Sequence, residues 1–105
     1  SLADTVMFAW YMAGRAAIKA NGDIVDASIA KLSEKAQEAA LKLRDLACSD
    51  EPDTGKYCAE VEKVMSHQSK EVMQELEEHN ADVAKAIGFI SPPPPHAHTN
   101  CWRKV

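Results

Sequence analysis

The sequence predicts an all-α fold: a long antiparallel helical hairpin with a shorter hydrophobic N-terminal helix packed on it, like a three-helix bundle, followed by an irregular proline-rich tail. Glycine and proline are rare, with four and five copies among 105 residues, and four of the prolines stand together. Apolar residues recur at alternating steps of three and four, the spacing of one helix face. We therefore assign residues 1–90 to a single helical domain and residues 91–105 to the proline-rich C-terminal tail.

The first predicted helix covers residues 3–20. Asp4 or Thr5 stands near its start, where an oxygen-bearing side chain accepts hydrogen bonds from free backbone amides. The segment from Val6 to Gly14 is apolar on every side of the helix rather than along one stripe. A helix of this kind is normally buried all round, so we expect it to need more contacts than one hairpin face supplies.

The hairpin is predicted from two longer helices, at residues 24–47 and 56–87. The first carries an apolar stripe with unbroken steps of four and three, made of Val25, Ile29, Leu32, Ala36, Ala39, Leu43 and Leu46. The second carries a similar stripe that Gln68 and His79 interrupt, and Gly88 ends it. A short turn rich in Asp, Pro and Gly joins the two helices, so we expect them to pack antiparallel.

The charge pattern argues against two classes of partner. The formal net charge is −4, and basic residues alternate with acidic ones, so no basic face is available to neutralise nucleic-acid phosphates. A basic amphipathic helix for anionic membranes is absent for the same reason, and no apolar segment reaches the roughly 20 residues that span a bilayer. We expect no nucleic-acid partner and no stable membrane span, while contact with a membrane surface stays open.

The three cysteines, Cys48, Cys58 and Cys101, indicate an oxidising compartment. Cys48 and Cys58 bracket the turn between the hairpin helices, so we expect a disulfide bond between them. The odd number leaves one thiol, and Cys101 is then free to form an intermolecular bond. Bridges from Cys101 to either of the others stay open as alternatives. On this basis we expect a secreted protein.

The leading functional hypothesis is protein–protein contact through the hydrophobic first helix. One hairpin covers only part of a helix circumference, so the rest would form an apolar patch of aromatic and methionine side chains, the types enriched at interface hot spots. The residues concerned are Met7, Phe8, Trp10, Tyr11, Met12 and Ile18. The partner would be a second copy or a different protein, as for an oligomer or a secreted effector or toxin subunit. Alternatively, the tail folds back and Trp102 covers the patch.

A second hypothesis is a carrier that holds a small apolar ligand in a helical cavity. The cavity would be lined by side chains of the first helix facing side chains of the third, namely Met7, Phe8, Trp10, Tyr11 and Met12 against Val61, Met65 and Val72.

A third hypothesis is metal binding, through either of two motifs. The ladder His67, Glu71, Glu75 and His79 has steps of four residues, and the tail carries His96-x-His98-x2-Cys101. The ladder lacks the carboxylates from several helices that di-iron bundles use, and the tail motif lacks a fourth ligand. We therefore expect no metal and no cofactor. Since Cys58 and His67 lie too far apart along one predicted helix to form a catalytic pair, we also expect no enzymatic activity.

Overall fold

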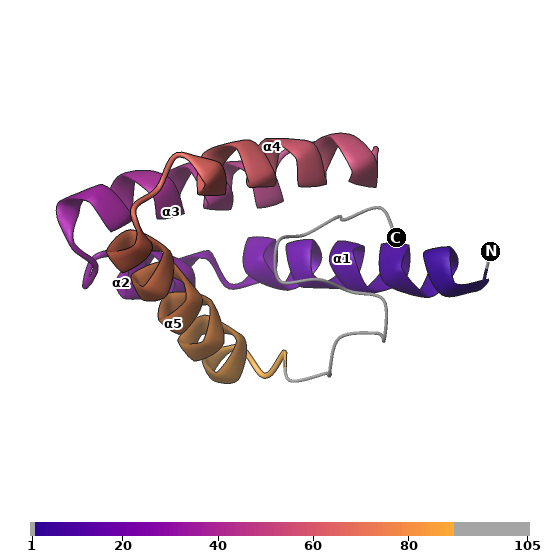
Figure 1. Cartoon of the computed structure of the whole chain (residues 1–105). Helices are drawn as coiled ribbons and strands as arrows, with labels where there is room; N and C mark the ends of the chain where they lie inside the picture. Colours follow the sequence, from indigo (N-terminus) through magenta and orange to yellow (C-terminus); the bar gives the residue numbers. More distant parts are fainter. Residues whose placement is uncertain (1, 90–105) are drawn as a thin grey trace.

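The computed structural model describes the backbone of residues 2–89 and the side chains of residues 9–89. This part of the chain contains no β-strand and five α-helices (Figure 1): α1 (Leu2–Ala20), α2 (Gly22–Ile29), α3 (Glu34–Ala47), α4 (Thr54–Ser66) and α5 (Lys70–Ala86). The predicted all-α class is confirmed. The proline-rich tail, residues 91–105, lies outside the described residues, so the division between domain and tail stays a prediction.

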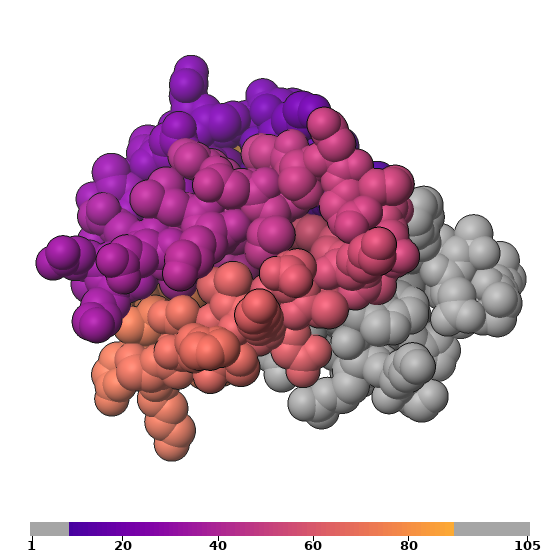
Figure 2. All heavy atoms as spheres, turned by 90° about the horizontal axis from the view of Figure 1, so that it is seen from above, coloured from indigo at the N-terminus to yellow at the C-terminus, as the bar shows by residue number. Residues whose placement is uncertain are grey.

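The helices α3 and α4 lie side by side and run in opposite directions, joined by the short segment 48–53. In Figure 1, α1 lies below this pair, and the short α2 leads the chain from α1 into α3. The last helix, α5, packs against α2 and α3. Seen from the side of α3 and α4, these two helices cover the middle of the surface, with α1 along one edge and the beginning of α5 along the opposite edge (Figure 2).

The predicted long hairpin is wrong in its helix lengths, because each of its two helices is broken once. The helix expected at 24–47 is divided into α2 and α3 at residues 30–33. The helix expected at 56–87 is divided into α4 and α5 at residues 67–69. The antiparallel pair of α3 and α4 is therefore shorter than predicted, and α2 and α5 take other directions.

A serine begins the new helix after each break. Ser33 Oγ accepts a hydrogen bond from the backbone amide of Ala36, and Ser69 Oγ accepts one from that of Val72. These contacts satisfy amide groups that have no partner in the first turn of a helix. A serine at this position stabilises a helix start by about 1 kcal/mol relative to alanine.

Glutamine side chains satisfy carbonyl groups on the other side of both breaks. Gln68 Nε2 donates a 2.9 Å hydrogen bond to the carbonyl of Val64, near the end of α4. Gln37 Nε2 donates one of 2.9 Å to the carbonyl of Leu32. Gln68 therefore does not sit as a polar interruption in a long apolar seam. It marks the place where the helix ends, since the last carbonyls of a helix need partners from outside it.

Two side chains of α5, one helical turn apart, fasten this helix to α2 and to the first break. Glu75 accepts hydrogen bonds from the backbone amide of Ser33 at 3.0 Å and from its Oγ at 2.7 Å. These two hydrogen bonds hold the pKa of Glu75 below its usual range. His79 Nδ1 shares a hydrogen bond of 2.7 Å with Ser28 Oγ. The direction of α5 is thus set by polar contacts as well as by apolar packing.

The buried apolar residues form two clusters instead of one. The larger lies between α2, α3 and α5 and contains Val25, Ile29, Ala36, Ala39, Ala40, Val72, Leu76 and Val83. The smaller lies between α1 and α4 and is formed by Tyr11 and Cys58, with Trp10, Tyr57 and Val61 packed against it. The first helix therefore shares its own small core with α4.

Arg15 joins α1 to the end of α3. It is only 5% exposed, and its guanidinium donates hydrogen bonds to the backbone carbonyls of Ala47, Ser49 and Glu51 at 3.2, 3.0 and 2.7 Å. The same group lies 4.3 Å from the centre of the Tyr57 ring on α4. A cation at a helix C-terminus meets free carbonyls and the negative end of the helix dipole. One buried charge thereby holds α1, α3 and α4 together.

We predict that Arg15→Met lowers the free energy of unfolding by about 2–4 kcal/mol, because buried carbonyls lose a charged donor. Chemical denaturation followed by circular dichroism measures this change. Arg44→Met is the matched control, since Arg44 pairs with Asp26 and Asp45 at the surface and exposed ion pairs contribute about 0–1 kcal/mol. An equal decrease in the free energy of unfolding for the two variants would show that Arg15 does not hold these helices together.

Candidate functional site

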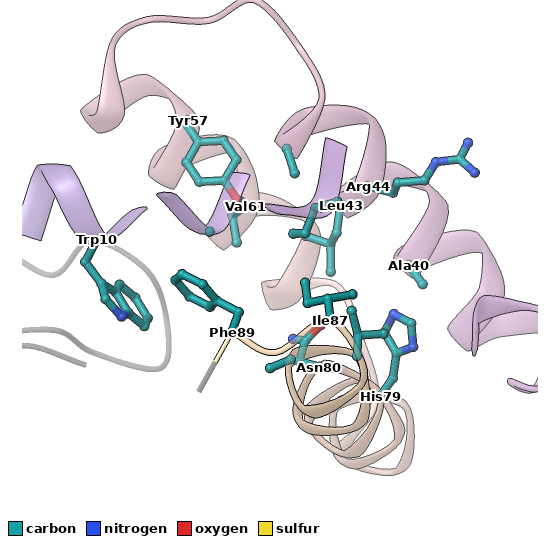
Figure 3. Close-up of a pocket in the computed structure, with 15 residues that line it drawn as sticks. Trp10, Ala40, Leu43, Arg44, Tyr57, Val61, His79, Asn80, Ile87 and Phe89 are labelled. Atoms are coloured by element: carbon teal, nitrogen blue, oxygen red, sulfur yellow. The ribbon is translucent and has the colours of Figure 1, made fainter. Parts of the chain in front are cut away.

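A cavity of about 390 Å³ lies between the two core clusters, and residues that pack in each cluster line it. Its walls come from α1, α3, α4, α5 and the segment directly after α5 (Figure 3). The lining residues are Trp10, Gly14, Ile18, Ala40, Leu43, Arg44, Ala47, Tyr57, Val61, His79, Asn80, Val83, Ala84, Ile87 and Phe89. Most of them are apolar. Glycine or alanine stands at several of these positions, which leaves space between the helices.

Phe89 is placed in the cavity wall by the way α5 ends. Gly88 has φ of +77°, in the left-handed region that glycine adopts without strain. The Phe89 amide donates to the carbonyl of Ala84 at 2.8 Å and the Gly88 amide to that of Lys85 at 3.3 Å, which is the Schellman motif. This reversal brings the Phe89 ring to α1, where it lies 3.5 Å from the position that a Cβ on Gly14 would take.

Trp10 supplies the aromatic end of the cavity on the side of α1. The centroid of its ring system lies 6.2 Å from that of Phe89 and 5.0 Å from that of Tyr11. The indole Nε1 is buried, and no acceptor among the described residues pairs with it. Buried donors without an acceptor are rare in folded proteins and cost about 1–3 kcal/mol. Trp10 therefore contributes its ring to the cavity wall, while its Nε1 stays without an acceptor among the described residues.

Arg44 contributes its hydrocarbon stem to the wall but not its charge. The guanidinium is paired with Asp26 and Asp45, and Figure 3 shows it turned away from the cavity. Hydrogen bonds to these two carboxylates raise the pKa of Arg44 above its usual value. No other lysine or arginine is among the described lining residues, so they offer no free positive charge to a ligand.

The other two ionisable groups of the described wall are neutral at pH 7. Burial lowers the pKa of His79, against a smaller opposing effect of Asp82. Burial also raises the pKa of Tyr57, although the nearby Arg15 acts in the opposite direction. The described surface of the cavity is therefore mainly apolar, with a few neutral polar groups such as the Asn80 amide and without free charge at neutral pH.

The predicted interface residues of α1 do not share one exposed face. Tyr11 is buried with Cys58 in the smaller cluster, and Trp10 lines the cavity. Ile18 packs against the larger cluster and also lines the cavity. These three side chains are turned into the fold, because α1 has packing partners on more than one side.

The remaining interface residues are partly described. Met12 is half-buried, and its sulfur accepts a 3.7 Å hydrogen bond from the Arg15 guanidinium. The side chains of Met7 and Phe8 lie outside the described residues, as does Trp102, which was the alternative cover for this patch. The interface hypothesis therefore stays a prediction.

The predicted disulfide bond between Cys48 and Cys58 is wrong. Cys48 is a free thiol directly after α3. Cys58 is disulfide-bonded and fully buried in the smaller cluster, beside Tyr11. The physical reason is the orientation of α4, which presents Cys58 to α1 instead of to the turn that precedes it. Cys101 lies outside the described residues.

The second helix break divides the predicted metal ladder. His67 follows the last residue of α4, whereas Glu71, Glu75 and His79 belong to α5. Glu75 and His79 each bond a serine near the first break. Within the described part of the chain, no three His, Cys, Asp or Glu side chains are grouped so that they could hold a metal ion. The tail motif that ends in Cys101 lies outside this part.

None of the described helices is both long and apolar enough to cross a membrane. No protein-family model matches the chain, and comparisons with curated proteins and with solved structures gave no significant match. Function must therefore be inferred from the cavity itself.

Only part of this cavity could be predicted. Trp10 and Val61 line it as the ligand-carrier hypothesis expects, whereas Met65 and Val72 pack in the larger cluster. The sequence analysis did not identify Phe89 as a lining residue. It could have been found from the glycine that ends a helix and is followed by a large apolar residue, a pattern typical of the Schellman cap.

We predict that stability falls as the pH is lowered from 7.5 to 5.5, and that His79→Gln removes most of this dependence. The folded-state pKa of His79 lies below the ordinary value of about 6.5, so the unfolded chain takes up the proton first. The contribution of neutral His79 to the free energy of unfolding is therefore present above pH 6.5 and is lost as the pH falls towards the folded-state pKa. Thermal unfolding at both pH values measures it. His67→Gln, at an exposed histidine, is the control, and equal pH dependence in the two variants would contradict the prediction.

We also predict that the disulfide partner of Cys58 is Cys101, because Cys48 is a free thiol and the chain has only three cysteines. Cys48 should then react with an alkylating reagent. Trypsin cleaves after Lys56 and Lys85 and so places the three cysteines in separate peptides. Mass spectrometry of the unreduced digest should show the Cys58 peptide linked to the Cys101 peptide and an alkylated Cys48 peptide. The undigested protein should have the mass of one chain. A disulfide-linked Cys48 peptide would contradict it.

Proposed function

We propose that this chain is a small, secreted, non-enzymatic carrier that holds one apolar molecule between α1 and the helices α3, α4 and α5. The observation that carries the proposal is the break in the core. Residues that pack in each of the two clusters line one common space, which no described side chain fills. A concave, mainly apolar space with a few polar groups is the usual form of a small-molecule site.

The size and the lining of the cavity suit such an occupant. Ligand pockets usually measure about 300–1,000 Å³ and are lined mainly by hydrophobic and aromatic side chains with a few polar groups. The cavity, at about 390 Å³, has Trp10, Tyr57 and Phe89 as aromatic walls and aliphatic side chains between them. A ligand that buries about 200 Å² of apolar surface gains about 5 kcal/mol from leaving water. Occupation would also stabilise the folded chain, because the ligand binds only that state.

Secretion is supported by the disulfide bond at Cys58, because disulfides persist mainly in oxidising compartments. Carriage needs no catalytic group, and the ionisable groups of the cavity wall are engaged in structural contacts. The contact surface first expected on α1 is a weaker candidate, since Trp10, Tyr11 and Ile18 are turned into the fold.

We predict that Ala84→Leu weakens ligand binding by about tenfold or more, because its larger side chain occupies part of the cavity that Ala84 lines. The probe is N-phenyl-1-naphthylamine, a neutral apolar dye whose fluorescence rises in apolar surroundings. The control is Ala81→Leu, which places the same side chain at an exposed position of α5. Titration of the full chain, with its disulfide intact, gives the Kd of each protein.

The titration distinguishes dye binding in the cavity from binding elsewhere and from no binding. Tight dye binding by the wild type and Ala81→Leu, and weak binding by a folded Ala84→Leu, supports the carrier function. Equal binding by both variants would place the dye elsewhere, and no binding by the wild type would contradict the proposal. Thermal unfolding of each variant confirms that a loss of binding is not a loss of folding.

A further inference from the structure

We infer that the cavity releases its ligand when the pH falls, and that proton uptake by His79 drives this release. The inference rests on the proposed function, because it names a regulator of the same cavity. It follows from the place of one histidine in the described structure. His79 belongs both to the cavity wall and to the contact that fastens α5 to α2, so a proton on it acts on the ligand and on the wall together.

The side chain of His79 lies between helices and away from bulk water. The residue is only 8% exposed, and its Nδ1 shares the 2.7 Å hydrogen bond with Ser28 Oγ of α2. Figure 3 shows the ring on the side of α5 that faces Ala40 of α3, another buried residue of the cavity wall. Protonation would put a positive charge into this place, where little water can solvate it, and so costs free energy.

The carboxylates on the neighbouring helices do little to offset that cost. Within one helical turn of His79 and Ser28, α2 and α5 carry Asp26, Glu75, Glu77, Glu78 and Asp82, and α3 adds Arg44 to the cavity wall. Asp26 is paired with Arg44, and Glu75 is bonded to Ser33. Glu77 and Glu78 are exposed. Asp82 favours the protonated form, but burial outweighs it and keeps the pKa of His79 below its ordinary value.

The ligand and the proton compete because each favours a different state of the cavity. A bound apolar molecule excludes water from the space, which makes a charge on His79 still more costly. An empty cavity can admit water to the wall. The complex therefore binds the proton more weakly than the empty protein does. By linkage, the protonated protein binds the ligand more weakly by the same factor.

The hydrogen bond with Ser28 extends this effect to the wall as a whole. The helix α5 and the residues directly after it contribute His79, Asn80, Val83, Ala84, Ile87 and Phe89 to the lining. His79 is one of the two polar side chains that hold α5 in its direction, the other being Glu75. Since a buried charge favours conformations that expose it to water, protonation favours movement of α5 away from α2 and opens the wall.

The experiment measures the Kd of N-phenyl-1-naphthylamine for the full chain, with its disulfide intact, at pH 7.5 and pH 5.0. The arylamine of this dye stays unprotonated over the whole range, so a change in Kd comes from the protein. We expect the Kd of the wild type to be about 3- to 10-fold higher at pH 5.0. His79→Gln keeps a polar partner for Ser28 but takes up no proton, so its Kd should stay nearly the same.

The control is His67→Gln, which removes an exposed histidine and should leave the pH dependence of the wild type unchanged. Circular dichroism at both pH values confirms that each protein compared is folded.

A second measurement uses the wild type alone, so it is decisive even if His79→Gln does not fold. The pKa of His79 is followed by NMR from the chemical shifts of its ring protons, without dye and with saturating dye. We expect a lower pKa in the complex, because the ligand excludes water from the cavity wall. Equal pKa values in the two states would overturn the inference.

The outcomes distinguish this inference from the carrier function. If the wild type binds the dye equally at both pH values, the carrier function stands and pH-dependent release is overturned. If the affinity of His79→Gln falls with pH as much as that of the wild type, another group takes up the proton and the role of His79 is overturned. If the wild type does not bind the dye at pH 7.5, the carrier function itself fails.

Discussion

A single buried guanidinium, that of Arg15, is the contact on which the helix arrangement depends. It satisfies the carbonyl of Ala47 at the end of α3 and two carbonyls of the segment that follows, and it stacks on Tyr57 of α4. Once Arg15 is held there, the rotation of α1 is also set, because residues spaced by three or four lie on one helix face. Tyr11 then reaches Cys58, and Ile18 reaches the larger cluster. The identity of one charged residue thereby decides which side of α1 faces each neighbour, although the run from Val6 to Gly14 is apolar all round.

The two anchors of the fold act on different helices, and His79 of the second anchor also lines the cavity. Arg15 holds α1 to the α3–α4 end, while Glu75 and His79 hold α5 to Ser33 and Ser28. The small residues Gly14 of α1 and Ala84 of α5 both line this cavity. Phe89, delivered by the Schellman turn after α5, reaches across this space to α1.

The chemistry of the cavity follows from how its polar groups are employed. Arg44 forms ion pairs with two aspartates at the surface, and His79 is neutral and bonded to Ser28. The indole Nε1 of Trp10 and the hydroxyl of Thr54 are buried without a hydrogen-bond partner among the described residues. The charged and ionisable groups of the wall are thus occupied in contacts that hold the helices in place. This arrangement supports binding more than catalysis.

The sequence by itself determined the all-helical class and the existence of a first helix with an apolar run, because scarce glycine and proline and a helical period act within a few residues. It did not reveal the two helix breaks, since the spacing from Ile29 through Leu32 to Ala36 continues across the first one without a fault. The helix is broken at Ser33, which donates hydrogen bonds to Glu75, a residue 42 positions further along the chain. The free thiol of Cys48, the burial of Cys58 and the cavity likewise depend on which helix faces which. Those contacts join distant segments, so only the tertiary structure could decide them.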